Sequence, residues 1–187
     1  MSIALALIDI QRDYFPGGRM ELTGMDLACE KACELLAFFR ERNWPRFHVQ
    51  HLSVRPNATF FLPGTTGYEI HEHVAPAVGE KVIQKNYPNA FRETDLREEL
   101  RQLDVKELVV CGAMSHMCVE ATTRAAFDLG FRCVVAHDAC ATRNLMFKGR
   151  TIAAEDVHGA SMAALGAVYA EVAAAREFIS NIENAGK

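Results

Sequence analysis

Short apolar runs alternate along this chain with segments of helical spacing, and this alternation leaves few folds open. Residues 3–8 read Ile-Ala-Leu-Ala-Leu-Ile and residues 108–111 read Leu-Val-Val-Cys. Such runs, without polar alternation, are typical of strands covered on both faces. Further strands are expected at 46–51, 82–85 and 131–136. Helices are expected at 26–42, after Thr94, after Cys118 and over 151–177. We therefore predict an α/β fold with a doubly wound, mainly parallel sheet and helices on both faces.

Length and composition narrow the classes of protein. The 187 residues carry a net charge of -4 and contain no basic block, which argues against nucleic acid or an anionic membrane as partner. No apolar run is long enough to span a membrane, and the amino terminus does not resemble an export signal. The six cysteines are then expected to be reduced thiols in a cytoplasmic protein. No linker or repeat divides the chain, so residues 1–187 are expected to form one domain.

Three reactive side chains follow separate predicted strands. Asp9 ends the first run, Lys85 ends a short strand, and Cys118 follows the loop after residues 108–111. Because the carboxyl ends of parallel strands meet at one edge of a sheet, we expect these side chains to lie together. Cys118 would sit at the start of a helix, where the helix dipole and free N–H groups favour a thiolate and an oxyanion.

Each of these residues has a chemical role in such a site and also an ordinary alternative. Asp9 could act as general base and then general acid, and Lys85 could lower the cysteine pKa by its charge. Alternatively, Asp9 caps a turn, Lys85 is solvated, and Cys118 is a small core residue. The predicted convergence of all three favours the chemical roles.

The chain resembles the isochorismatase-like cysteine hydrolases, which include nicotinamidases and N-carbamoylsarcosine amidohydrolases. The matching residues occur in the family's order over nearly the whole chain. They are Asp9-Ile10-Gln11 with Tyr14-Phe15, Lys85 with Asn89-Ala90-Phe91 and Thr94-Asp95-Leu96, Gly112 to Val119 with Thr122, and Asp138-Ala139.

The resemblance implies a catalytic triad of Asp9, Lys85 and Cys118. It further implies a cis peptide bond between Ala113 and Met114, and an oxyanion hole formed by the backbone N–H groups of Met114 and Cys118. The implied activity is hydrolysis of a small-molecule amide at its carbon–nitrogen bond, through a thioester on the cysteine. Two alternatives remain open: an isochorismatase-type vinyl-ether hydrolase, which would not depend on the cysteine, and a non-catalytic small-molecule binder or redox-sensing thiol.

Substrate selection is expected from residues whose neighbourhoods place them near the strand ends. The connection 52–78 is too long and too rich in proline and glycine for a simple link, and it is a candidate for substrate binding. Plain packing is the alternative for the phenylalanines, and His116 could instead shield the thiol. The candidates are Tyr14, Phe15, Gln50, Phe60, Phe61, Ser115 and His116.

No metal or other cofactor is expected. Nicotinamidases carry an aspartate after the second strand, a histidine two positions on and another downstream, whereas this chain has His51 and Ser53 at the first two positions. The histidines at 48, 51, 71 and 73 leave some other metal site open. The cysteines at 29 and 33 share a helix face, but the sequence does not indicate two further ligands near them. Because the family is usually oligomeric, the apolar tail 162–175 is expected to contact a second subunit or else to cover its own sheet.

Overall fold

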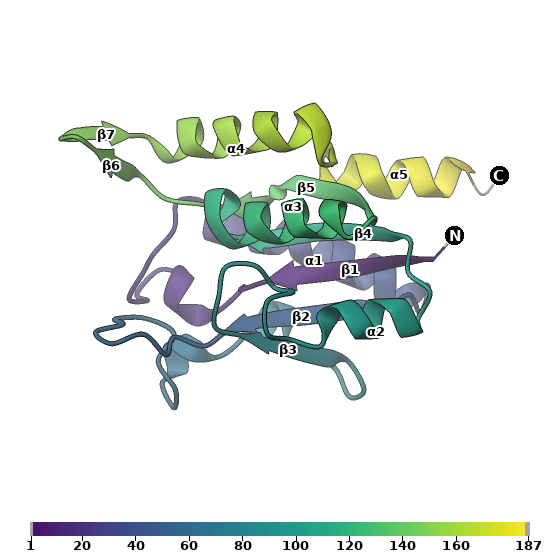
Figure 1. Cartoon of the computed structure of the whole chain (residues 1–187), viewed down its shortest axis with the longest axis horizontal. Helices are drawn as coiled ribbons and strands as arrows, with labels where there is room; N and C mark the ends of the chain where they lie inside the picture. The colour runs from purple at the N-terminus through teal and green to yellow at the C-terminus, as the bar shows by residue number, and fades with distance from the viewer. Residues whose placement is uncertain (1, 186–187) are drawn as a thin grey trace.

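The computed structural model describes residues 2–185 and contains a six-stranded parallel sheet in the order β3-β2-β1-β4-β5-β8 (Figure 1). Successive strands are added outward from β1 in one direction and outward from β4 in the other, so the order reverses between β1 and β4. This is the arrangement of a doubly wound fold. The predicted fold class is confirmed. The strands are β1 (Ile3–Ile8), β2 (Arg46–His51), β3 (Lys81–Lys85), β4 (Glu107–Ala113), β5 (Arg132–Ala141) and β8 (Glu171–Ala173).

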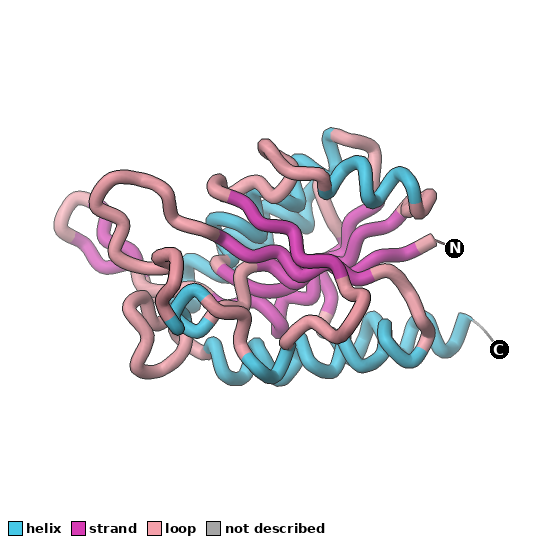
Figure 2. The backbone as a smooth tube through the Cα atoms, turned by 90° about the horizontal axis from the view of Figure 1, so that it is seen from below, coloured by secondary structure: helices cyan, strands magenta, loops and turns pink. Residues whose placement is uncertain are grey.

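Helices cover both faces of the sheet (Figure 2). Helices α1 (Met25–Glu41) and α5 (Ala175–Ala185) pack on one face, where Ile3, Leu5 and Leu7 of β1 point. Ala4, Ala6 and Ile8 point to the other face. That face is covered by α2 (Leu96–Gln102), α3 (Glu120–Asp128) and α4 (Ala154–Val168). Every residue of β1 is therefore buried, which explains its unbroken apolar sequence. Among residues 2–185, no helix combines the length and apolarity needed to cross a membrane.

Two segments differ from the sequence-based expectation. Strand β5 runs on to Ala141 instead of ending near residue 136, because its pairing with β4 resumes at Cys140 after an irregular stretch. The tail 151–177 is not purely helical. Strand β7 (Arg150–Ile152) closes a hairpin with β6 (Leu145–Phe147), and β8 separates α4 from α5. Three-residue strands are too short to give a periodic sequence pattern.

The connection 52–78 lies at the carboxyl edge of the sheet and contains two short 3₁₀ turns, Thr66–Tyr68 and Glu72–Val74. Its first half is held by Asp13, whose carboxylate accepts the Phe61 N–H at 2.6 Å and the Arg19 N–H at 3.1 Å. Asp13 is buried, and a side chain at Gly67 would collide with its carboxylate. The 52–78 connection is thus fixed against the segment that follows β1.

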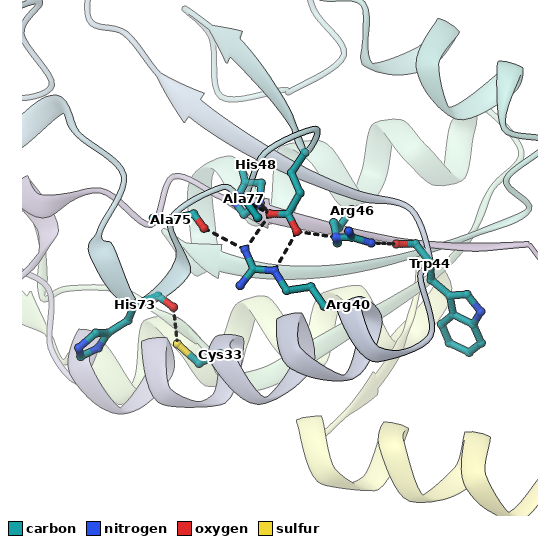
Figure 3. Close-up of polar contacts among 9 residues, drawn as sticks. Cys33, Arg40, Trp44, Arg46, His48, His73, Ala75 and Ala77 are labelled. Atoms are coloured by element: carbon teal, nitrogen blue, oxygen red, sulfur yellow. Dashed lines mark hydrogen bonds and ion pairs between the residues drawn. The ribbon is translucent and has the colours of Figure 1, made fainter.

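The far end of this connection is held by Glu80, whose carboxylate is almost fully buried. It is bonded to Arg40 of α1 at 2.7 Å, and to Arg46 at 2.6 Å and His48 at 2.8 Å of β2 (Figure 3). The Ala77 N–H donates to the same carboxylate at 2.8 Å. Hydrogen bonding from Arg40 holds the pKa of Glu80 well below its usual value, so the carboxylate is charged at neutral pH.

Gly112 of β4 pairs with Ile8 of β1, and the two backbones lie close together there. Its φ is +117°, and a Cβ atom there would collide with the carbonyl group of Ile8. Only glycine combines this conformation with the lack of a side chain. Gly112 therefore sets the spacing between the residues that lead into Asp9 and those that lead into Ala113.

Replacing Gly112 with alanine is expected to lower the free energy of unfolding by about 3 kcal/mol or more, through backbone strain and separation of the two strands. Urea unfolding measures the change. Gly159→Ala is the matched control. Gly159 is exposed on α4. Among residues 2–185, no heavy atom apart from its chain neighbours and the backbone of its own helix lies within 4 Å of the position that an alanine methyl group would take, so this change should be neutral or stabilise by up to about 1 kcal/mol. Equal midpoints for Gly112→Ala and the wild type would contradict the argument.

Candidate active site

The Lys85 ammonium is the centre of a buried polar cluster at the carboxyl edge of the sheet. Its Nζ donates to Asp9 Oδ2 at 2.7 Å, to His51 Nδ1 at 3.0 Å and to Cys118 Sγ at 3.3 Å. Lys85 ends β3, His51 ends β2, and Asp9 directly follows β1. The convergence of Asp9, Lys85 and Cys118 that the strand ends predict is therefore present in the structure.

Asp9 is held in an uncommon backbone conformation. Its φ is +51°, in the left-handed region that aspartate enters more readily than most residues. Its N–H donates to the Val49 carbonyl at 2.9 Å, and its own carbonyl accepts the Gln11 N–H at 2.9 Å. Among residues 2–185, Oδ1 of Asp9 has no hydrogen-bond partner although it is buried. This oxygen is free to accept a proton, and a carboxylate oxygen of Asp9 lies within 4.8 Å of the Cys118 sulfur.

Cys118 lies in a wide helical turn, Ser115–Val119, that continues into α3. The Met114 carbonyl accepts the N–H groups of Met117 at 3.0 Å and Val119 at 3.3 Å, and the peptide bond between Ala113 and Met114 is cis. The helical winding thus begins three residues before Cys118 instead of at it. The sulfur still lies in the first turn, at the edge where β4 ends.

The resting thiol differs from the sequence-based expectation. Burial and the nearby Asp9 carboxylate raise the pKa of Cys118, and together they outweigh the opposing charge of Lys85. The expected lowering of this pKa is wrong for the resting site, because a sequence does not show how deeply a side chain is buried. Burial would lower the pKa of Lys85, but Asp9 and Cys118 outweigh that effect and raise it. At rest the cluster therefore contains a charged ammonium group and a protonated thiol, and the thiol needs a base to remove its proton before it can attack carbon.

His51 is a member of this cluster that the sequence-based reasoning considered only as a metal ligand. Burial and then the charge of Lys85 lower the pKa of His51 to about 4, so the ring is neutral at pH 7 and accepts from Lys85. His51 pairs in register with Lys85 across β2 and β3. The rule that selected Asp9 and Lys85, position at a strand end, also applies to His51. Donor atoms of Asp9, His51 and Cys118 lie within 4.8 Å of one another, but the ammonium already bonds to all three residues and takes the place of a cation.

An aromatic wall borders the cluster. The Tyr14 ring lies 4.6 Å from Phe61 and 6.0 Å from Phe60, and Phe61 lies 6.0 Å from the His51 ring, between centroids. Burial raises the pKa of the Tyr14 hydroxyl, and the nearby Cys118 and Asp9 raise it further. Cys118 is only 5% exposed, so the surrounding protein encloses the sulfur almost completely.

The other residues predicted to bind substrate have protein partners. Phe15 stacks on His71 with 3.8 Å between ring centroids. Gln50 donates to the Tyr68 carbonyl at 3.1 Å and points to the opposite face of β2 from His51. Their roles in binding stay predictions.

Ser115 and His116 connect the turn before Cys118 to neighbouring elements. Ser115 is buried, donates to the Ala141 carbonyl at 3.2 Å and contacts His158 Nδ1 at 2.8 Å. His116 Nδ1 lies 2.7 Å from the Thr142 hydroxyl. These contacts join the turn after Met114 to the end of β5, to Thr142 and to α4. The substrate-binding roles of the two residues also stay predictions.

Gln11 fixes the end of β2. Its side-chain oxygen accepts the His51 N–H at 2.7 Å, and its side-chain nitrogen donates to the carbonyls of His51 at 3.0 Å and Tyr68 at 2.7 Å. Gln11 is fully buried. One amide thus aligns His51 with the segment that follows Asp9, and it also holds the 52–78 connection.

Comparison with known proteins matches the geometry to one family. A model of the isochorismatase domain matches residues 3–177. An uncharacterized isochorismatase family protein of Bacillus subtilis is 50% identical over 179 residues, covering 96% of this chain and 99% of the relative. Nicotinamidase 3 of Arabidopsis thaliana is 34% identical over 147 residues, covering 75% and 74%. A crystal structure from Oleispira antarctica has a TM-score of 0.92 at 49% identity and covers 96% of each chain.

Replacing Gln11 with alanine is expected to destabilise the protein by about 2–4 kcal/mol, because the buried N–H and carbonyl of His51 lose their partner. Urea unfolding of the variant measures this cost. Gln102→Ala, at an exposed position on α2, should change stability by less than about 0.5 kcal/mol. Similar losses in both variants would show that the buried amide has no special role.

Stability is expected to fall as the pH drops from about 6.5, the ordinary histidine pKa, toward the pKa of His51 near 4. Over this interval the unfolded chain binds a proton at His51 that the folded chain does not, so protonation favours unfolding. Unfolding free energies measured between pH 4 and 7 should therefore decline less steeply in His51→Gln. Burial also lowers the pKa of His48, so a His48→Gln variant separates its share. An unchanged slope in His51→Gln would contradict the assignment.

Proposed function

The chain belongs to the isochorismatase family of hydrolases, and on that premise we propose that it hydrolyses the carbon–nitrogen bond of a small-molecule amide with Cys118 as nucleophile. The observation that carries the proposal is the buried contact of one ammonium, Lys85, with both the Asp9 carboxylate and the Cys118 sulfur. Nucleophile and base are then held together before a substrate binds.

In the first half of the reaction, the thiol proton passes to Asp9 as the sulfur attacks the amide carbonyl carbon. A carbon–sulfur bond forms, and the electron pair of the carbonyl moves to its oxygen. The backbone N–H groups of Met114 and Cys118 are proposed to stabilise that oxyanion. Asp9 then returns the proton to the leaving nitrogen, the carbon–nitrogen bond breaks, and a thioester remains.

In the second half, a water molecule gives a proton to Asp9 and attacks the thioester carbon. The carbon–sulfur bond breaks, the acid leaves, and the sulfur recovers its proton from Asp9. Lys85 keeps its charge throughout and offsets the negative charge that moves between Asp9 and the sulfur. His51 stays neutral, because its burial and the charge of Lys85 both lower its pKa, and it accepts a hydrogen bond from the Lys85 ammonium.

The raised pKa of Cys118 supports an acid–base partner for the thiol. A thiol that is protonated at rest attacks carbon only when a neighbouring base removes its proton. The unpaired oxygen of Asp9 supplies a place for that proton. A relative named as a nicotinamidase supports an amide as the substrate class, and the site's burial supports a small molecule.

Turnover of a panel of small amides, followed by ammonia or amine release, tests the proposal. Cys118→Ala should abolish turnover, and Asp9→Asn should lower kcat by about 10²–10⁴-fold. Mass spectrometry of the wild type after rapid quenching should detect an acyl group on Cys118.

Cys133→Ala is the control, because this buried thiol of β5 lies outside the cluster, so the folded variant should keep its turnover. Full amide turnover by folded Cys118→Ala would contradict the proposed role of Cys118 as nucleophile. Absence of turnover on every amide, together with no acyl adduct, would favour a binding protein.

A further inference from the structure

A second cluster of sulfur and imidazole groups lies away from the proposed catalytic site, where α1 meets the 52–78 connection. It consists of Cys29 and Cys33 of α1 and His71 and His73 of the connection, and is called the Cys/His cluster below. Cys29 and Cys33 are one helical turn apart, so both side chains project from the same face of α1. The sequence alone indicated no further ligands near Cys29 and Cys33. The structure places His71 and His73 beside these two cysteines.

The contacts within the Cys/His cluster are short. Cys29 Sγ lies 3.9 Å from His71 Nδ1, and one ligand atom each from Cys29, His71 and His73 lie within 4.8 Å of one another. The ring centroids of His71 and His73 are 4.8 Å apart. Cys33 Sγ donates to the His73 carbonyl at 3.1 Å, and Figure 3 shows this thiol directed from α1 at the His73 backbone. All six cysteines of the chain are free thiols.

The nitrogen of His71 that faces Cys29 is the unprotonated one, and its lone pair accepts a long hydrogen bond. His71 Nδ1 accepts the His73 N–H at 3.4 Å, so the ring proton belongs on Nε2. Nε2 lies 3.6 Å from a carboxylate oxygen of Glu72. A histidine that presents one nitrogen to a ligand position and the other to a carboxylate has the arrangement found around metal-binding histidines.

The four residues of the Cys/His cluster differ in their exposure to solvent. Cys29 is buried, Cys33 and His71 are half-buried, and His73 is exposed. A cation would supply the positive charge that the buried sulfur lacks, and it can enter from the side of His73.

We propose that Cys29, Cys33, His71 and His73 form a four-ligand site for a thiophilic divalent cation of the zinc class. Two thiolates and two imidazoles are a preferred tetrahedral donor set for such an ion. Ligand atoms around tetrahedral zinc are separated by about 3–4 Å. Those of Cys29, His71 and His73 already lie within 4.8 Å of one another, and the Cys33 thiol has to turn from the His73 carbonyl toward them. On binding, each thiol releases its proton to solvent and forms a metal–sulfur bond. Cys33 gives up its hydrogen bond to the His73 carbonyl, and His71 Nδ1 gives up the hydrogen bond that it accepts from the His73 N–H.

The site has a structural consequence near the proposed catalytic groups. The His71 N–H donates to the carbonyl of Ile10 at 2.9 Å, one residue after Asp9, and the His71 ring stacks on Phe15. A bound cation would fasten the 52–78 connection to α1 at this point. Its role would be to position that segment, since none of the four ligands contacts the Lys85 ammonium by a hydrogen bond among residues 2–185.

Cobalt(II) titration of the reduced, metal-stripped full chain tests the site. We expect one equivalent of cobalt to give a thiolate-to-cobalt charge-transfer band and the intense visible bands of tetrahedral coordination. Both should be lost in Cys29→Ser and in His73→Ala. His73 is exposed, so its variant is expected to fold even if Cys29→Ser does not. Zinc should displace the cobalt, and it should raise the melting temperature of the wild type in a concentration-dependent way that His73→Ala abolishes.

Cys118→Ser is the control for metal binding at the catalytic thiol, and it should keep the cobalt spectrum unchanged. The proposal is overturned if the wild type gives no charge-transfer band, if His73→Ala keeps the full spectrum, or if Cys118→Ser loses it. The first two results exclude the four-ligand site, and the third moves the metal to the cluster around Lys85.

Discussion

The buried ion pair between Lys85 and Asp9 is the interaction on which the rest of the site depends. Both side chains are fully excluded from solvent, and their charged atoms are 2.7 Å apart. Removing one partner of such a pair leaves a buried charge and costs about 3–5 kcal/mol. The pair joins the ends of β1 and β3, which β2 separates in the sheet, so it also fixes the edge on which Cys118 and His51 converge. Architecture and chemistry are therefore constrained by the same contact.

The charge balance of this pair explains the states of its neighbours. A second negative charge on Cys118 would be poorly solvated beside Asp9, which keeps the sulfur protonated at rest. A second positive charge on His51 would be buried and would lie beside Lys85, and both effects keep that ring neutral. The site thus holds one ammonium, one carboxylate and two neutral groups. A proton moving from sulfur to carboxylate leaves the total charge of the cluster unchanged, so burial does not oppose that step.

Much of this arrangement is predictable from sequence. The apolar runs give the strands, and their polar ends give Asp9 and Lys85, because parallel strands bring their carboxyl ends together. What the sequence does not show depends on burial and on distance through space. The raised pKa of Cys118 results from burial, and the proximity of Cys29 to His71 results from packing between α1 and a connection 42 positions later. His51 ends a strand as Asp9 and Lys85 do, but its partner, Lys85, is 34 positions away. The short strand β8 lacks the length for a periodic pattern.

The 52–78 connection is held in place by contacts with other parts of the protein. Asp13 and Gln11 hold it from the segment after β1, and Glu80 holds its end against α1 and β2. The Cys/His cluster lies between these anchors, where the connection meets α1 through thiols and imidazoles instead of through charged groups. Because a thiol is a weak hydrogen-bond donor and acceptor, the contacts of Cys29 and Cys33 make this central anchor the weakest of the three unless a cation joins its members. Metal binding at the Cys/His cluster would therefore make the part of the 52–78 connection beside Asp9 and Phe15 more rigid, while the two outer anchors stay in place.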